Sequence, residues 1–172
     1  PLAIYGAEDT QAGRDQILAA TYPEWPPHQQ ITRPIIAPGE RREIGGFVVE
    51  FFAVEHRVPT VAVRVSHGGT VLAFSADSIP CANLVACARG ADLFVCDAIC
   101  AALDGERWAS HARRLMHPVA REAAEMAVEA GVGALALTHI GRFADPANIA
   151  AEAGAIFRGP LAVPDDGARL TL

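Results

Sequence analysis

Apolar positions along the chain first follow the spacing of strands and later alternate between strand and helix spacing. Residues 47–54, FVVEFFAV, predict a strongly apolar strand, and 60–66 with 71–75 predict a hairpin around Gly68-Gly69. After Asp77 the pattern predicts a helix from Pro80 to about residue 89 and then a buried strand over 91–97. Strands followed by βα units over one core indicate a single α/β (α+β layered) domain spanning residues 1–172.

The stretch 116–143 is the most informative part of the chain. Pro118 marks the first turn of an amphipathic helix that Gly131 ends, and a short apolar strand of Leu and Ala follows. Thr138 and His139 stand where that strand ends. Because α/β proteins expose functional side chains at strand ends, His139 is a candidate metal ligand or proton carrier.

The remaining segments give weaker signals. Before residue 47 we expect a strand at 1–5, a helix from Asp9 or Thr10 to about Tyr22, a proline-rich loop at 23–30, an extended piece at 31–36 and a polar connection at 38–46. A polar arginine-containing loop is expected at 101–116. After residue 143 we expect a helix capped by Asp145 and ending near Phe157, and then closing strands at 161–163 and 168–172.

Composition narrows the class of protein. With 172 residues and 51% hydrophobic content, the chain can bury one substantial core. No apolar run approaches the roughly 20 residues that cross a bilayer, and no signal peptide is recognisable, so we expect a cytoplasmic protein without membrane contact. A net charge of −6 argues against a large basic surface, although a local arginine cluster could still bind RNA.

The four cysteines, Cys81, Cys87, Cys96 and Cys100, contain no C-x-x-C pair of the kind that binds structural zinc. In a cytoplasmic protein they are expected to be reduced, buried thiols without disulfides.

Three positions share one local pattern, in which an apolar strand is followed by a His or Asp and then by a turn. They are His56 in VEHRVP, Asp77 in FSADSIP and His139 in LTHIGR. Two imidazoles and a carboxylate at one rim of a sheet are a ligand set for a divalent ion, zinc first, with an open position for water. Asp77 could also bridge two ions, as in dinuclear hydrolytic sites. Each residue alone is typical of a strand-end turn, but three matched contexts favour a metal site.

Two further residues are candidates for the same site. His117, which precedes Pro118, suits substrate contact or proton donation to a leaving group; the alternative is packing at a helix entry. Asp97, which ends the FVCD strand, could hold a His tautomer or bond to the surrounding backbone; the alternative is a loop-forming Asp.

The other histidines receive lesser roles. His111 is a weaker rival of His117, His28 is expected to be a solvated loop residue, and His67 a polar turn residue.

These motifs together resemble the C-terminal portion of a metallo-β-lactamase-fold hydrolase of the ribonuclease Z-like branch, which also includes arylsulfatase-like and phosphonate-pathway cyclic phosphodiesterase enzymes. PLAIYG, VEHRVPTVAVRV, AFSADSIP, HPVAREAAEMAVEAGV and ALTHIGRF resemble successive family segments. The resemblance implies a partial αβ/βα sandwich. It also implies that His56 binds one zinc ion, His139 binds the other, Asp77 bridges them, and His117 is the proton donor.

The sequence departs from the family pattern in three ways. The H-x-H-x-D-H motif, which supplies most metal ligands in the family, is absent. Only residues 66–69 stand where long-arm ribonuclease Z enzymes insert a tRNA-gripping arm. VCDAIC stands where those enzymes have a His-Glu-Ala-Thr motif, and HPV replaces their His-Ser-Thr motif. These departures favour the hydrolysis of a smaller ester or phosphodiester over tRNA processing.

The resulting hypothesis is a zinc-dependent hydrolase in which hydroxide bound to the metal attacks a phosphodiester or related ester. Two zinc ions are expected in the intact protein and partial or no occupancy in this chain, because the remaining ligands would come from a missing N-terminal half. The alternatives are a tRNA 3′-processing endoribonuclease and a non-catalytic module. The expected partner is a small ester or phosphodiester substrate; RNA is not supported, and a homodimer is left open.

Overall fold

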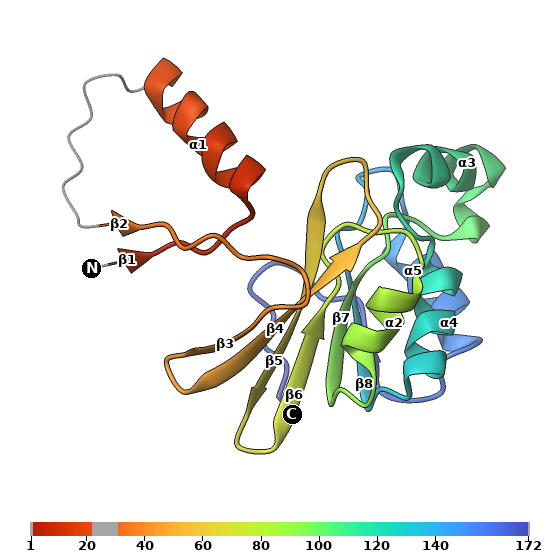
Figure 1. Cartoon of the computed structure of the whole chain (residues 1–172). Coiled ribbons are helices and arrows are strands. Elements are labelled where there is room, and N and C mark those ends of the chain that lie inside the picture. Colours follow the sequence, from red (N-terminus) through yellow and green to blue (C-terminus); the bar gives the residue numbers. More distant parts are fainter. Residues whose placement is uncertain (1, 22–30, 172) are drawn as a thin grey trace.

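The computed structural model describes residues 2–21 and 31–171 (Figure 1). Its main feature is a seven-stranded sheet in the order β3-β4-β5-β6-β7-β8-β9. The strands are β3 (Arg41–Ile44), β4 (Phe47–Val54), β5 (Thr60–His67), β6 (Thr70–Phe74), β7 (Leu93–Asp97), β8 (Ala134–Thr138) and β9 (Leu161–Ala162). Pairing is antiparallel from β3 to β6 and parallel from β6 to β9. The predicted fold class, a layered α/β domain, is confirmed.

One face of the sheet is covered by helices. They are α2 (Ala82–Ala88), α4 (Ala120–Ala130) and α5 (Pro146–Gly154). Their apolar sides pack against alternate strand residues, among them the fully buried Phe94 and Leu135. Fully buried Ala62 and Ala73 belong to the same core, and their small side chains leave room for close helix packing.

The opposite face is also apolar. Val63, Leu72, Phe74 and Val95 alternate with the core residues and point to this second side. The helices of the described structure that contact the sheet lie on the other side. Phe74 on this second face is therefore 43% exposed. The domain therefore has the layers of half a sandwich.

The N-terminal segment forms a separate small unit. β1 (Leu2–Ala3) pairs in parallel with β2 (Ile31–Thr32), and α1 (Glu8–Thr21) lies between them in sequence. In Figure 1 these elements project away from the seven-stranded sheet. The predicted proline-rich loop at 23–30, with His28, lies outside the described residues.

Four expectations about local structure were wrong. Residues 38–46 contain strand β3, an edge strand whose sequence RREI looks like a polar connection because its side chains are exposed or half-buried. Residues 101–116 contain the 3₁₀ turn η1 (Ala102–Asp104) and helix α3 (Glu106–Leu115). α3 is amphipathic, but its apolar stripe is short and lies among charged residues, so the segment looks polar in sequence. Residues 168–171 form no strand, and α5 ends at Gly154, before Phe157.

All four cysteines are free thiols. Cys87, Cys96 and Cys100 are buried, as predicted, whereas Cys81 is only half-buried. Burial raises the pKa of Cys87 to about 12 and that of Cys100 to about 11, so both thiols are protonated at neutral pH. Among residues 2–21 and 31–171, no helix combines the length and the hydropathy needed to span a bilayer.

Candidate metal centre

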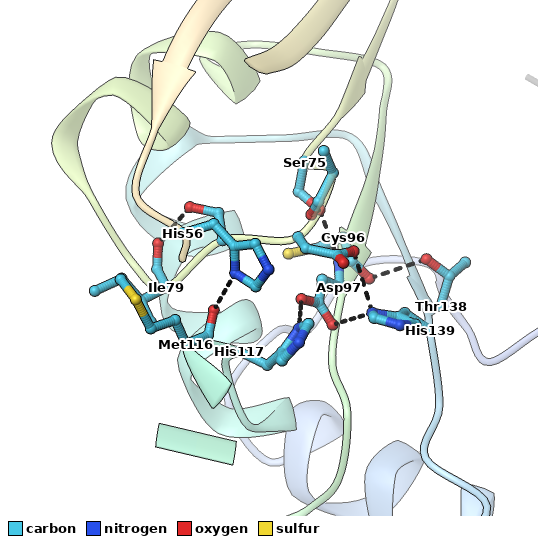
Figure 2. Close-up of polar contacts among 12 residues, drawn as sticks. His56, Ser75, Ile79, Cys96, Asp97, Met116, His117, Thr138 and His139 are labelled. Atoms are coloured by element: carbon cyan, nitrogen blue, oxygen red, sulfur yellow. Dashed lines mark hydrogen bonds and ion pairs between the residues drawn. The ribbon is translucent and has the colours of Figure 1, made fainter. Parts of the chain in front are cut away.

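The candidate site lies at the rim where the parallel strands β6, β7 and β8 end. Asp77, Asp97, His117 and His139 each offer one metal-ligand atom there, and these atoms all lie within 4.8 Å of one another. Figure 2 shows Asp97, His117 and His139 pointing toward one another. Carboxyl ends of adjacent parallel strands meet at one edge of a sheet, which explains how residues distant in sequence converge.

Asp97 is the most constrained member of the group. Its side chain is 2% exposed, and its Oδ2 accepts a hydrogen bond from Nδ1 of His117 at 2.6 Å. Its backbone N–H donates to Oγ of Ser75 at 2.8 Å. Burial raises the pKa of Asp97 to about 7, while the adjacent His139 opposes that shift.

The second oxygen of Asp97 tests whether the residues fit a metal. Oδ1 is buried and has no hydrogen-bond partner among the described residues; the nearest ion-pair partner is Nδ1 of His139 at 3.4 Å. A buried carboxylate oxygen without a partner is costly. A cation coordinated by two imidazoles and two carboxylates would satisfy it, so the donor set fits zinc or a similar divalent ion.

His139 occupies an unusual backbone conformation. Its φ of 59° lies in the left-handed region, and Ala76, just before Asp77, has a φ of 52°. Nδ1 of His139 lies 3.2 Å from Oδ1 of Asp77. The two turns thus bring the imidazole and the carboxylate together, as strained residues at functional sites often do.

His117 is buried at the start of α4. Its backbone N–H donates to the carbonyl of Ala112, and its ring centroid lies 4.9 Å from that of His139. Burial lowers the pKa of His117, although the negative charge of Asp77 works in the opposite direction. Burial thus favours the neutral ring, and an ionised Asp97 carboxylate accepts the hydrogen bond from its Nδ1.

His56 lies beside this group but outside it. Its Nδ1 lies 3.2 Å from the carbonyl oxygen of Met116, and its ring centroid lies 5.0 Å from that of His117. A carbonyl can only accept, so Nδ1 of His56 carries the proton and Nε2 is the nitrogen left for a metal. Met116 adopts a left-handed conformation, with a φ of 65°, at the end of α3.

All five residues singled out from the sequence lie at this one rim: His56, Asp77, Asp97, His117 and His139. Their roles as metal ligands or proton carriers stay predictions. Sequence reasoning missed Ser75 and Met116, whose hydroxyl and carbonyl hold Asp97 and His56. Ser75 could have been noticed as the first polar residue after an apolar strand, in FSADSIP. Nothing in the sequence indicates that the backbone carbonyl of Met116 would have a role.

The remaining described histidines lie elsewhere. His67 bonds to the carbonyl of Gly46 at the far end of β5, as a turn residue would. His111 packs edge-on against Trp108 and Phe143.

An aromatic stack connects the two segments that carry the site histidines. Trp108 of α3 stacks on Phe143 with ring centroids 3.9 Å apart and an interplanar angle of 10°. α3 leads into His117, and Phe143 follows His139 in a loop fixed by a hydrogen bond from the N–H of Gly141 to the carbonyl of Ile99. Gly141 has no space for a Cβ, which would lie 2.8 Å from the Phe143 ring.

The chain is similar in sequence to known hydrolases of the ribonuclease Z type. No protein-family model matches the chain. Ribonuclease Z of Haloarcula marismortui is 36% identical over 121 residues, which cover 67% of this chain and 38% of that protein.

Solved structures match more of the chain. The metallo-β-lactamase fold protein YhfI from Bacillus subtilis is 27% identical with a TM-score of 0.80, covering 97% of this chain and 64% of YhfI. Zinc-bound PqqB from Methylobacterium extorquens, 20% identical with a TM-score of 0.73, shares the fold over 100% of this chain and 63% of its own. The chain therefore spans less than two thirds of each of these relatives.

Replacing Asp97 with Asn should stabilise the metal-free chain at pH 8. In the folded chain the pKa of Asp97 is raised from 3.8 to about 7. The proton on this carboxyl therefore stabilises the fold fully below pH 3.8, and that stabilisation is lost as the pH rises through about 7. Asn has no charge to desolvate, and the gain at pH 8 should be on the order of 2 kcal/mol. Chemical unfolding in EDTA at pH 4 and pH 8 measures it, with the exposed Asp166→Asn as control. Equal stabilities at pH 8 would contradict the expectation.

Replacing Trp108 with Leu should destabilise the chain by about 2 kcal/mol, because the stack and buried area are both lost. A double-mutant cycle with Phe143→Leu should show a coupling of about 1 kcal/mol. Thermal unfolding measures both values. Phe47, which is 45% exposed and pairs with His67 far from the site, provides the matched Phe→Leu control. Additive effects at 108 and 143 would show that the stack contributes nothing.

Proposed function

Because this chain belongs to the metallo-β-lactamase-fold hydrolases related to YhfI and ribonuclease Z, we propose that the intact protein is a zinc-dependent hydrolase of a phosphodiester or related ester. The supporting observation is the convergence of two carboxylates and two imidazoles within 4.8 Å at the sheet rim. The buried Oδ1 of Asp97 adds to it, since this oxygen makes no hydrogen bond among the described residues and a cation at the rim would offset its charge.

We assign metal binding to Asp77, His139 and His56. Asp77 and His139 are each nearly half exposed at the rim, so their ligand atoms are accessible. The hydrogen bond from His56 to Met116 leaves its Nε2 available. A bound zinc ion supplies Lewis acidity, which acidifies water and stabilises negative charge on an ester. Asp77 would bridge two such ions only if further ligands came from outside residues 1–172.

His117 and Asp97 form the proton-transfer pair in this proposal. With its Nδ1 proton held by Asp97, His117 has Nε2 free to accept a proton from water and to release it to the departing oxygen. The carboxylate stabilises the imidazolium that forms between these two steps. The short bond of 2.6 Å also fixes the ring orientation.

Two alternatives predict different measurements. The similarity to a ribonuclease Z favours tRNA 3′ processing as the second candidate, but β5 and β6 are joined by a tight turn at Gly68-Gly69 with no arm to grip RNA. A non-catalytic module would carry no zinc. Zinc content of the intact protein separates the module from the hydrolase, and cleavage of a tRNA precursor separates the two enzymes.

Asp77→Ala and His117→Ala should have different effects in the intact protein. Asp77→Ala removes the candidate bridging ligand, so both activity and bound zinc should be lost. His117→Ala should lower kcat by about 10²–10⁴-fold, the usual contribution of a general acid or base, with zinc retained. Ester hydrolysis and metal analysis measure the two effects. Equal zinc loss in both variants would assign His117 to metal binding.

This chain alone should bind zinc weakly and with less than two ions per molecule, because it offers few ligands for a dinuclear site. Equilibrium dialysis followed by metal analysis measures the stoichiometry, with His139→Ala as the variant that should abolish binding. The exposed His67, far from the rim, provides the matched control His67→Ala. Tight occupancy of two ions by residues 1–172 would contradict the expectation.

A further inference from the structure

A cavity of about 800 Å³ opens beside His139. It lies between the end of β8 with the loop that follows and the segment 163–170 after β9. His139 and Thr138 line it, so the cavity adjoins the candidate metal centre directly. Its volume is in the range of small-molecule binding sites and is too small for a folded RNA.

The lining of the cavity is mixed, with apolar walls on part of its surface and a negative rim. Ile140 and Val163 are half-buried walls, and Leu170 is 46% exposed at the edge. Asp165 and Asp166 are exposed and also line it, whereas no Lys or Arg side chain does. Apolar walls gain by covering an apolar group, and the two carboxylates repel an anionic one.

We propose that this cavity receives the organic group of the ester substrate and selects groups that carry no negative charge and have an apolar part to place against Ile140 and Val163. This inference rests on the proposed function, since it names the class of ester that the metal centre would act on. The position of His139 supports it, because the same residue lines the cavity and belongs to the cluster of ligand atoms. A substrate whose reacting ester lies at the rim would extend its organic group along Ile140 and Val163.

The charge preference separates this substrate class from nucleic acids. Two rim carboxylates near an anionic group in water should weaken its binding by about three- to tenfold, and salt should reduce the difference. An RNA strand carries a phosphate at every nucleotide and would place several of them near Asp165 and Asp166. The cavity therefore favours a small ester with a single reacting anion.

The test uses the metal-free chain in EDTA and two probes of nearly the same shape, benzyl alcohol and 4-(hydroxymethyl)benzoate. Methyl NMR shifts of Ile140, Val163 and Leu170 report occupancy. Benzyl alcohol should shift these methyls and bind about three- to tenfold more tightly than the carboxylate probe. Equal binding of the two probes, or no shift with benzyl alcohol up to its solubility limit, would overturn the inference.

Variants link the preference to particular residues. In the double variant Asp165→Asn/Asp166→Asn the two affinities should become nearly equal. The double variant Glu125→Gln/Glu129→Gln removes the same charge from the exposed side of α4 and should leave the ratio as in the wild type. Leu170→Ala, at an exposed wall position, should weaken benzyl alcohol binding without unfolding the chain. A ratio that falls equally in both double variants would show a general charge effect and overturn the inference.

The results also distinguish a failure of the cavity inference from a failure of the proposed function. Because the probes bind without metal, their binding can succeed although the intact protein holds no zinc; the hydrolase proposal would then fail while the cavity inference holds. Conversely, a zinc-loaded intact protein that hydrolyses esters with anionic and uncharged organic groups at the same kcat/KM would overturn the inference and leave the hydrolase proposal standing.

Discussion

The rim depends on one buried carboxylate. Asp97 ends β7, the strand between β6 and β8, and its side chain meets His117 on one oxygen and faces His139 on the other. Such a group is unfavourable in an apolar sheet end, as its raised pKa shows. The fold retains it with three supports, namely the His117 bond, the Ser75 hydroxyl and the proximity of His139. A residue that is costly for stability and well held in position is typical of a functional site.

Backbone geometry provides the second constraint. The described chain has three residues other than glycine with positive φ, and all lie at the rim: Ala76, Met116 and His139. Each makes the chain turn sharply where a strand or helix ends, which directs Asp77, His117 and His139 to a common point. Left-handed conformations cost roughly 1 kcal/mol or more for such residues. Their concentration at one place indicates that the site geometry, and not the stability of the fold, dictates them.

Much of this arrangement could be predicted from the sequence, because it depends on local patterns. The apolar runs before Asp77, Asp97 and His139 identify strand ends, and strand ends of a parallel sheet share an edge. The family resemblance, which was drawn from those motifs, was confirmed by the comparisons with known proteins. Helix α3 was not predicted because charged residues dominate its sequence and its apolar stripe is only a few residues long. Met116 acts through a carbonyl that every residue possesses. The cavity beside His139 joins segments distant in sequence, so only tertiary structure reveals it.

The uncovered face of the sheet is continuous with the rim that carries the site. Asp97 lies two residues after Val95 and four after Leu93, so strand alternation places its side chain on the same face as the apolar residues that no helix covers in the described structure. Phe74, which ends β6 on that face, is 43% exposed. Anything that covered the face for the apolar area it offers would therefore also remove the Asp97 side of the rim from water, and would strengthen the electrostatic interactions there.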